Sequence, residues 1–421
     1  MLDKTLYTIR QFIPKSIFNF FNPAYHWTLS LISAVIYGFP SRKIKVIAVT
    51  GTKGKSSTVE ILNAILEKAG RKTALSNTIR YKIDNVSNRN LSKMSTPGRF
   101  FLQRLVKQAV EADCEYILME MTSQGALLYR HRFIDLDTLI FTNLTPEHIE
   151  AHGSYENYRD SKLSIAKNLS RSKKPIKTII ANTDDKEAQL FLACKADRTI
   201  GFNLNNVQPY NIDQSGIDFT FAGTKVHSNL QGQFNLYNIL GAITCAKNEN
   251  VSDSDIISAV QNFSEIPGRL EKIEAKDFTV IVDYAHTVDS LTKVYEIYKG
   301  SPIIGVLGGT GGGRDTWKRA EMGKIADKYC KEIILTNEDP YDESPIKIIS
   351  DVAKGITDHK AQIIIDRREA IRTALRLAKS GDYVIITGKG TDPYIMGPNN
   401  SRQPWSDSEV VKEELEKISL R

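Results

Sequence analysis

A glycine-rich segment that follows an apolar run is the clearest chemical signal in this 421-residue sequence. The apolar residues 46–49 lead into the segment, and a helical pattern begins directly after it. Backbone N–H groups of such a turn and of a helix N-terminus can bind a polyphosphate, while Lys55 reaches the terminal phosphates and Ser56 ligates Mg²⁺. A plain glycine turn is the alternative reading. The segment consists of Gly51, Thr52, Lys53, Gly54, Lys55, Ser56 and Ser57.

Two further candidate residues are Glu120 and Lys162, because of their positions relative to a predicted strand and a predicted helix. Glu120 follows the apolar run 116–119, and the carboxyl ends of strands are where α/β sheets bind ligands. Lys162 lies in a helical stretch. Taken alone, the first would be a solvated strand end and the second part of a solvated helix face.

The elements that must position these residues alternate along the chain. Beyond residue 43, apolar β-rich runs alternate with helical patterns such as 55–69 and 99–111, which predicts α/β architecture with mainly parallel sheets. The strands are expected at 45–50, 115–120, 138–142, 177–181, 279–283, 303–307, 332–336, 362–365 and 382–387. The polar segment 203–223 is expected to form loop or short antiparallel strands.

A break near 266–268 predicts the domain boundaries. We expect a short apolar N-terminal segment (1–43), a central P-loop ATPase domain (44–267) and a C-terminal Rossmann-like α/β domain (268–421).

The charge balance argues against nucleic acid as a partner. The chain has 56 Lys and Arg against 49 Asp and Glu, a net charge of +7, and its basic residues are spread along the sequence and not clustered. A small phosphate-bearing substrate suits this balance. The four cysteines are far apart and lack metal-site spacing, so we expect a cytoplasmic protein; they are Cys114, Cys194, Cys245 and Cys330.

The N-terminal segment is rich in apolar and aromatic residues. Residues 27–39 form an apolar run that is too short to span a bilayer. We expect a helix packed on the following domain. An interfacial membrane contact, helped by Lys15, Arg42 and Lys43, is the less favoured alternative.

Taken together, the motifs resemble the Mur ligases, ATP-dependent enzymes that add amino acids to the bacterial cell-wall peptide, and in particular the muramyl-tripeptide synthetase branch. The resemblance covers about residues 44–421. It rests on GTKGKSS (51–57), LMEMTS (118–123), FTNL (141–144), EHIEAHG (147–153), YRDSK (158–162), GQFNLYN (232–238), PGRLE (267–271), VDYAHT (282–287), GGRD (312–315) and GKG (388–390).

The resemblance implies roles for individual residues in binding ATP and Mg²⁺. The loop 51–57 would hold the ATP phosphates. It further implies that Glu120 and His148 ligate Mg²⁺ together with Ser56, and that Lys162 is carbamylated by CO₂ and holds a second Mg²⁺. Asn235 and Asn238 would contact the adenine, and Arg269, Asp283 and His286 the phosphates and ribose. Lys55, Lys162, His148 and Arg269 would then act in catalysis.

The same resemblance implies where the two other substrates bind. The muramyl peptide would contact Ser95, Thr96, Ser123 and either Arg130 or Arg132, because a one-residue insertion leaves the alignment ambiguous. The amino-acid pocket would include Arg314, Gly388 and Asp392, the last in place of the usual Glu. The family's diaminopimelate signature Asp-Asn-Pro-Arg is here Glu338-Asp339-Pro340-Tyr341, and loss of the Arg fork makes lysine or ornithine credible beside diaminopimelate.

A final departure concerns the N-terminal domain. The family carries a uridine-binding domain of roughly 90 residues before the loop, the size of a small domain, and here about 43 residues precede it. We therefore expect the protein to recognise the muramyl peptide itself and to depend little on a UDP group, so that the substrate could be lipid-linked. The expected activity is ligation of a diamino acid to a muramyl dipeptide through an acyl phosphate, by a monomer. The alternatives are another ligase of the superfamily, such as a folylpolyglutamate synthase, or a P-loop NTPase switch.

Overall fold

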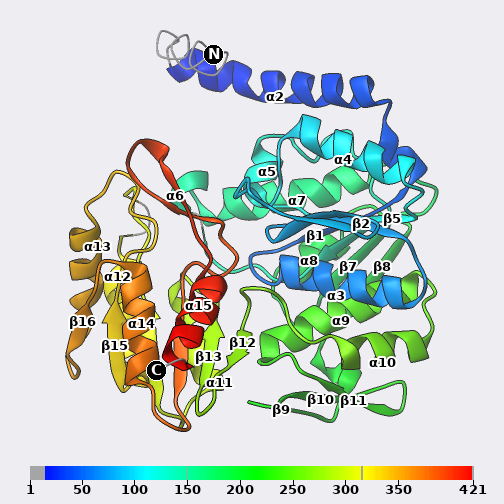
Figure 1. Ribbon diagram of the computed structural model, residues 1–421. Helices are drawn as coiled ribbons and strands as arrows, with labels where there is room; N and C mark the ends of the chain where they lie inside the picture. Colours follow the sequence, from blue (N-terminus) through cyan, green and yellow to red (C-terminus); the bar gives the residue numbers. More distant parts are fainter. Residues whose placement is uncertain (1–14, 148, 314–315, 420–421) are drawn as a thin grey trace. The chain divides into compact units, whose positions relative to one another are not determined.

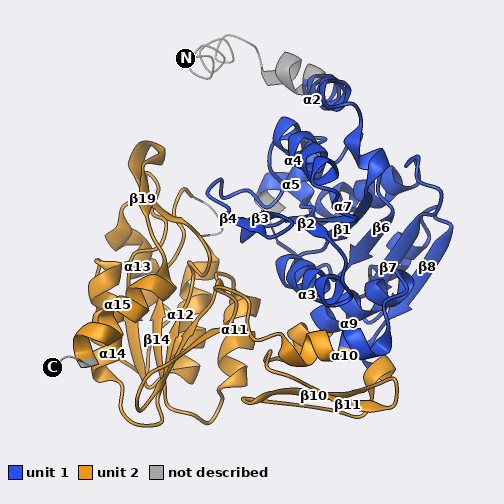
Figure 2. Ribbon diagram, turned by 45° about the vertical axis from the view of Figure 1, so that its right-hand side comes forward, with its two compact units in different colours: residues 1–204, 237–256 blue, residues 205–236, 257–421 orange. Residues whose placement is uncertain are grey.

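Buried β-branched strands followed by helices build two α/β units. The computed structural model describes residues 15–147, 149–313 and 316–419. The first unit comprises residues 1–204 and 237–256, and the second comprises residues 205–236 and 257–421 (Figure 2). The predicted α/β class with mainly parallel sheets is confirmed.

The first unit contains an eight-stranded sheet in which only the β2–β3 and β3–β4 pairs are antiparallel (Figure 1). Across the sheet the strands are β4 (Val86–Arg89), β3 (Arg80–Ile83), β2 (Thr73–Ser76), β5 (Tyr116–Glu120), β1 (Lys45–Thr50), β6 (Thr138–Phe141), β7 (Thr178–Asn182) and β8 (Arg198–Phe202). Because β1 lies between the parallel strands β5 and β6, the carboxyl ends of all three meet at one edge of the sheet.

Helices cover both faces of this sheet. α4 (Arg99–Glu111) and α7 (Tyr155–Leu169) cover one face, and α3 (Lys55–Lys68) and α9 (Gln233–Asn248) cover the other (Figures 1 and 2). Alternating strand residues fill the core on the α4 and α7 side. The shorter helices are α5 (Ser123–Leu127), α6 (Ile149–His152), α8 (Ala188–Leu192) and α10 (Asp253–Asn262).

The helix expected near the N-terminus is present as α2 (Lys15–Tyr37), and it packs on the first unit. The Trp27 ring lies 5.3 Å from the ring of Phe133, and Ser30 Oγ donates a hydrogen bond to the Tyr129 carbonyl (2.9 Å). A 3-10 turn (Pro40–Lys43) then leads into β1. In the part of the chain that the structure describes, no helix combines the length and the apolarity needed to cross a membrane.

The second unit contains a six-stranded sheet that is parallel except for the β12–β13 pair. Its strands in order are β12 (Glu271–Glu274), β13 (Thr279–Val282), β17 (Tyr383–Ile386), β14 (Ile303–Leu307), β15 (Glu332–Leu335) and β16 (Ala361–Ile363). Its helices are α11 (Val288–Ile297), α12 (Lys318–Tyr329), α13 (Pro345–Ala353), α14 (Arg367–Leu377) and α15 (Asp407–Ser419). Side chains of α11 to α13 and of α14 and α15 fill two separate cores on the sheet.

Two small antiparallel sheets complete this unit. One contains β9 (Tyr210–Asp213), β10 (Gly216–Phe221) and β11 (Thr224–Ser228), and the other contains β18 (Tyr394–Met396) and β19 (Arg402–Pro404). The first accounts for the segment that the sequence assigned to loop or short antiparallel strands.

Candidate active site

The glycine-rich loop joins the end of β1 to the start of α3, as the motif predicts. Two of its glycines are required by the backbone and by close neighbours. Gly51 has φ +149°, and a Cβ there would lie 2.0 Å from Thr142 Oγ1. Gly54 has φ +83°, and a Cβ there would lie 2.1 Å from Asn238 Oδ1. The loop therefore keeps its shape only with glycine at these positions.

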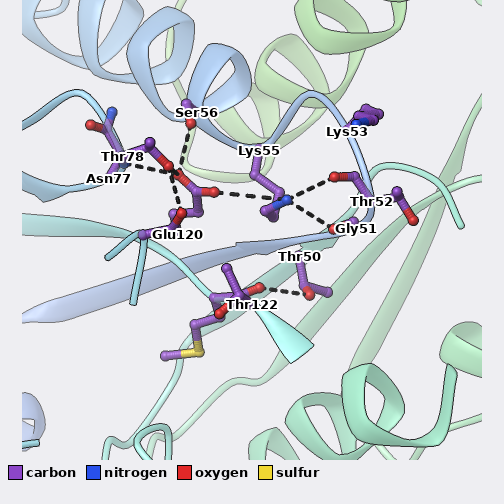
Figure 3. A network of polar contacts seen from close by, with 12 residues as sticks. Thr50, Gly51, Thr52, Lys53, Lys55, Ser56, Asn77, Thr78, Glu120 and Thr122 are labelled. Atoms are coloured by element: carbon purple, nitrogen blue, oxygen red, sulfur yellow. Dashed lines mark hydrogen bonds and ion pairs between the residues drawn. The ribbon is translucent and has the colours of Figure 1, made fainter. Parts of the chain in front are cut away.

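Lys55, the first residue of α3, lies back over this loop. Its Nζ donates to the carbonyl oxygens of Gly51 (3.1 Å) and Thr52 (2.9 Å), and it lies 3.7 Å from Glu120 Oε1 (Figure 3). The ammonium group is thus placed between the loop backbone and a carboxylate, where it can neutralise a phosphate.

Glu120 ends β5 and is almost completely buried. Its Oε2 accepts hydrogen bonds from Ser56 Oγ (2.7 Å) and from the backbone N (3.1 Å) and Oγ1 (2.9 Å) of Thr78 (Figure 3). Burial raises the pKa of this carboxyl, but the charge of Lys55 and the hydrogen bonds from Ser56 and Thr78 outweigh it and hold the pKa below its ordinary value. Glu120 is therefore ionised at neutral pH.

Lys162 reaches the same loop from the middle of α7. Its side chain is buried, its Nζ donates to the Gly51 carbonyl (2.6 Å), and it lies 4.8 Å from the centre of the Tyr158 ring. Burial and the nearby charge of Lys55 lower the pKa of Lys162 well below its ordinary value. This shift favours the neutral amine, which is the form that reacts with CO₂.

Residues without an assigned role in the sequence also fix the loop. Lys53 N donates to Asn143 Oδ1 (2.9 Å), Lys53 Nζ pairs with Glu147 (2.9 Å), and Thr52 Oγ1 lies 2.8 Å from the Tyr158 hydroxyl. The partners Asn143, Glu147 and Tyr158 all belong to segments that the sequence analysis quoted as motifs. The motifs therefore identified these segments, but they did not predict the contacts of the individual residues. Thr78, by contrast, comes from a loop after β2 that carried no signal.

The candidate muramyl-peptide residues gather at the end of β5. Thr96 Oγ1 donates to the Glu120 carbonyl (3.1 Å), and Ser95 Oγ lies 2.6 Å from Thr78 Oγ1, one step from the Glu120 carboxylate. Arg130 Nη1 donates to the Thr96 carbonyl, and Ser123 Oγ lies 3.1 Å from Nε2 of His152.

The two alternative arginines differ in their surroundings. The Arg132 guanidinium lies 5.6 Å from the centre of the Tyr129 ring, whereas Arg130 contacts the backbone of Thr96. Of the two arginines, Arg130 is thus the one that contacts a candidate muramyl-peptide residue, and we call this group of residues the candidate acceptor site.

In the second unit, three candidate ATP residues lie around one short segment. The Asp283 carboxylate accepts hydrogen bonds from the backbone N of Leu270 (2.8 Å) and of Ala285 (2.7 Å). The rings of Tyr284 and His286 meet edge to face at 4.6 Å, and the Arg269 guanidinium lies 4.3 Å from the centre of the Tyr284 ring.

The two candidate adenine residues both belong to α9 and are buried. Asn235 Nδ2 donates to the Gln231 carbonyl (2.9 Å), and Asn238 lies beside Gly54 of the loop.

Two of the candidate amino-acid residues, Asp339 and Asp392, lie against Lys389, which is completely buried. Lys389 Nζ pairs with Asp339 (2.7 Å) and with Asp392 (3.1 Å). Glu338 accepts a hydrogen bond from Thr310 Oγ1 (2.8 Å), but its buried Oε2 has no hydrogen-bond partner among the described residues. A Cβ on Gly388 would lie 2.4 Å from this oxygen. Burial and the charge of Asp339 raise the pKa of Glu338.

Two predicted site residues, His148 and Arg314, lie outside the described residues. Within the described residues, no three His, Cys, Asp or Glu side chains gather into a group that could hold a metal ion by themselves.

Comparisons with known proteins bear on both units. The Mur ligase middle domain matches residues 49–246, and the Mur ligase glutamate ligase domain matches residues 268–390. A UDP-N-acetylmuramoyl-L-alanyl-D-glutamate--2,6-diaminopimelate ligase of Syntrophomonas wolfei is 35% identical over 381 residues, which are 87% of this chain and 77% of the relative.

Solved structures show the same architecture. A structure with the same ligase title has a TM-score of 0.62 and 26% identity and covers 89% of this chain and 79% of its own. A Mycobacterium tuberculosis folylpolyglutamate synthase has a TM-score of 0.70 at 15% identity, with 87% of this chain and 93% of its own covered. The second likeness shows the fold alone.

Proposed function

This chain belongs to the Mur ligase family, and we propose that it uses ATP to join a diamino acid to a muramyl dipeptide in peptidoglycan synthesis. The observation that carries the proposal is the convergence on the glycine-rich loop. Lys55 and Lys162 both donate to the Gly51 carbonyl, and the ionised Glu120 lies beside Lys55. The positive charge of Lys55 at a loop shaped for phosphates suits transfer of a phosphoryl group.

The proposed reaction has two steps. A carboxylate oxygen of the dipeptide attacks the γ-phosphorus of ATP; an O–P bond forms, the bond to the bridging oxygen breaks, and ADP leaves. The amino group then attacks the carbonyl carbon of the acyl phosphate, the C–O bond breaks, and phosphate leaves as the amine loses a proton. Lys55 neutralises charge on the transferred group, and the loop 51–57 holds the nucleotide.

The donor set at Glu120 fits Mg²⁺, which is typically held by one or two carboxylates together with substrate phosphates. Glu120 and Ser56 supply hard oxygen atoms, and the ion would supply charge neutralisation at the phosphates. We further propose that neutral Lys162 attacks CO₂, forming an N–C bond and releasing a proton, so that an anionic carbamate joins this set. His148, outside the described residues, is proposed as a further ligand.

We propose Arg130 as the residue that binds a carboxylate of the muramyl peptide, with Ser95, Thr96 and Ser123 around it. Its contact with Thr96 supports this choice over Arg132. Arg130→Ala should raise KM for the dipeptide about tenfold or more, because a charge-assisted contact is lost. Arg132→Ala should leave KM within about twofold. The opposite ranking would assign the role to Arg132.

The amino-acid side chain is proposed to carry a cation that meets Glu338. The name of the Syntrophomonas wolfei relative gives diaminopimelate as its substrate, but Tyr341 stands here at the place of the family's arginine. The buried, unpaired oxygen of Glu338 suits an ammonium group, whereas Asp339 and Asp392 already share Lys389. Lysine and ornithine are therefore proposed beside diaminopimelate.

We also propose ATP contacts for the remaining candidate residues. Arg269, Asp283 and His286 are proposed for the phosphates and ribose, and Asn235 and Asn238 for the adenine.

Phosphate release tests this function. The ligase requires ATP, the muramyl dipeptide and an amino acid together. Omission of either the dipeptide or the amino acid should therefore reduce phosphate release to background. Diaminopimelate, lysine and ornithine are compared as the third component. Phosphate release from ATP alone at the full rate would instead identify a P-loop NTPase without ligase activity.

A further inference from the structure

The N-terminal helix α2 turns its small residues toward the protein. Ser30, Ser33 and Ala34 are at most 1% exposed, and Ser30 Oγ donates to the Tyr129 carbonyl. His26, on the same helix, lies 2.8 Å through Nδ1 from the guanidinium of Arg99 on α4. These contacts fix which side of the helix faces the first unit.

The opposite side of α2 is an apolar stripe that the described residues leave largely exposed. Tyr25, Ile32, Val35 and Ile36 are between 42% and 61% exposed, at spacings of seven, three and one residues that place them along one side of a helix. Of the sixteen large apolar side chains that are exposed in the described part of the chain, these four and Trp27 lie within one short stretch of α2. A helix of a globular protein normally buries such a stripe.

The charged residues in the sequence of the N-terminal segment 1–43 are mostly basic. Residues 1–43 contain five basic residues and one acidic residue, a net of +4 of the chain's +7, and α2 itself contains no acid. Burial and the charges of Arg99 and Arg130 lower the pKa of His26 to about 4, which shows that further cations lie beside the helix. Apolar and aromatic residues flanked by cations are the composition of helices that lie on anionic membranes.

We propose that α2 docks on an anionic lipid surface, with the stripe Tyr25, Ile32, Val35 and Ile36 in the boundary between headgroups and acyl chains. The helix is proposed to lie on the surface without crossing it, since no helix among the described residues is long and apolar enough to cross a membrane. A second copy of the chain fits the stripe less well, because a two-fold pairing of α2 would bring the same cations together.

Docking has one consequence that rests on the proposed function. Helix α2 contacts Tyr129, and the next residue is Arg130 of the proposed acceptor site. A docked enzyme would therefore bring that site close to a lipid-linked muramyl peptide. The docking itself does not depend on the reaction, and its test uses no turnover.

Flotation with vesicles tests the proposal on the full-length chain. We compare vesicles of phosphatidylcholine with and without phosphatidylglycerol, and expect binding to the anionic vesicles that weakens with salt. The double variant Val35→Gln, Ile36→Gln should bind roughly tenfold or more weakly, because it removes apolar area from the stripe. Ile346→Gln, at an equally exposed site on α13, is the matched control and should bind as the parent does.

Three results would overturn the proposal. The first is an intact chain that fails to float with anionic vesicles, and the second is a double variant that floats as well as the parent. The third is a dimer in light scattering that the double variant converts to a monomer, since a second copy would then cover the stripe. Unchanged melting temperature and unchanged phosphate release with water-soluble substrates establish that the double variant is folded.

Discussion

Replacing Lys162 with methionine tests whether this lysine is a structural cation or a reactive neutral amine. The side chain is buried on α7, and its Nζ donates to the Gly51 carbonyl. Methionine keeps most of the volume and removes the charge. The Gly51 carbonyl still accepts a hydrogen bond from Lys55, so the variant leaves no unpaired backbone group at this point.

The expected change in stability follows from the lowered pKa of Lys162. Between its lowered folded value and its ordinary value of 10.5, the unfolded chain binds more protons than the folded chain, so stability rises with pH. The buried cation therefore costs stability most at lower pH. Lys162→Met should raise the free energy of unfolding at pH 7 by about 1–4 kcal/mol, the range found when buried ion pairs are replaced by apolar residues of similar volume. The gain should shrink as the pH rises toward 10.5.

Urea denaturation from pH 7 to more alkaline pH, in buffer free of CO₂, measures this effect. Lys167→Met provides the control, because Lys167 is on the same helix but exposed. It should show no such pH-dependent gain. Ligase activity with added bicarbonate is measured in parallel. Lys162→Met should lose on the order of 10²-fold or more in kcat. Lys162→Ala should lose as much, and there acetate should restore part of the activity, because alanine leaves space for an anion at this place.

The reasoning about Lys162 would be refuted by a variant that is less stable than the parent at every pH. That result would identify the lysine as a needed structural cation. Full activity in a folded Lys162→Met variant would remove the residue from the site.

Three other changes test separate parts of the account. Lys55→Ala should lower turnover on the order of 10²-fold or more, with the melting temperature nearly unchanged, and near-normal turnover would reject the phosphate-binding role. Gly54→Ala should lower the free energy of unfolding by about 1–3 kcal/mol and weaken ATP binding, because it combines a positive φ with displacement of Asn238. Gly70→Ala, with a similar φ and open space, should leave ATP binding unchanged in calorimetry. Glu338→Gln should raise KM for the diamino acid about tenfold and spare KM for ATP, and an unchanged amino-acid KM would exclude Glu338 from the pocket.

The elements that surround the site could be read from the sequence to a large extent. The bounds of β1 and α4 agree with the prediction, and α3 differs by one residue. These segments have long, regular apolar patterns. β2, β3 and β4 were not predicted, and β4, which is exposed at all four positions, has no apolar pattern that could indicate a strand. Their pairing depends on neighbouring strands and not on their own pattern.

The contacts between side chains at the site were harder to predict from the sequence than the helices and strands. The motif places Lys55 and Ser56, but only the fold shows Thr78 on the Glu120 carboxylate and Tyr158 on Thr52. The side of α2 that faces the protein could not be predicted from the sequence either, because an apolar stripe on a helix is normally assigned to the core. Here small residues such as Ser33 are buried instead.

The most direct test of the central claim, ligation through an acyl phosphate, follows one oxygen atom. The muramyl dipeptide is labelled with ¹⁸O in its reacting carboxylate, and the phosphate released during amide formation is analysed by mass spectrometry. The proposed reaction transfers one labelled oxygen to each phosphate, because the bond that breaks in the second step joins carbon to the carboxylate oxygen. Phosphate without the ¹⁸O label would contradict the claim, since its fourth oxygen would then come from water and not from the carboxylate of the dipeptide.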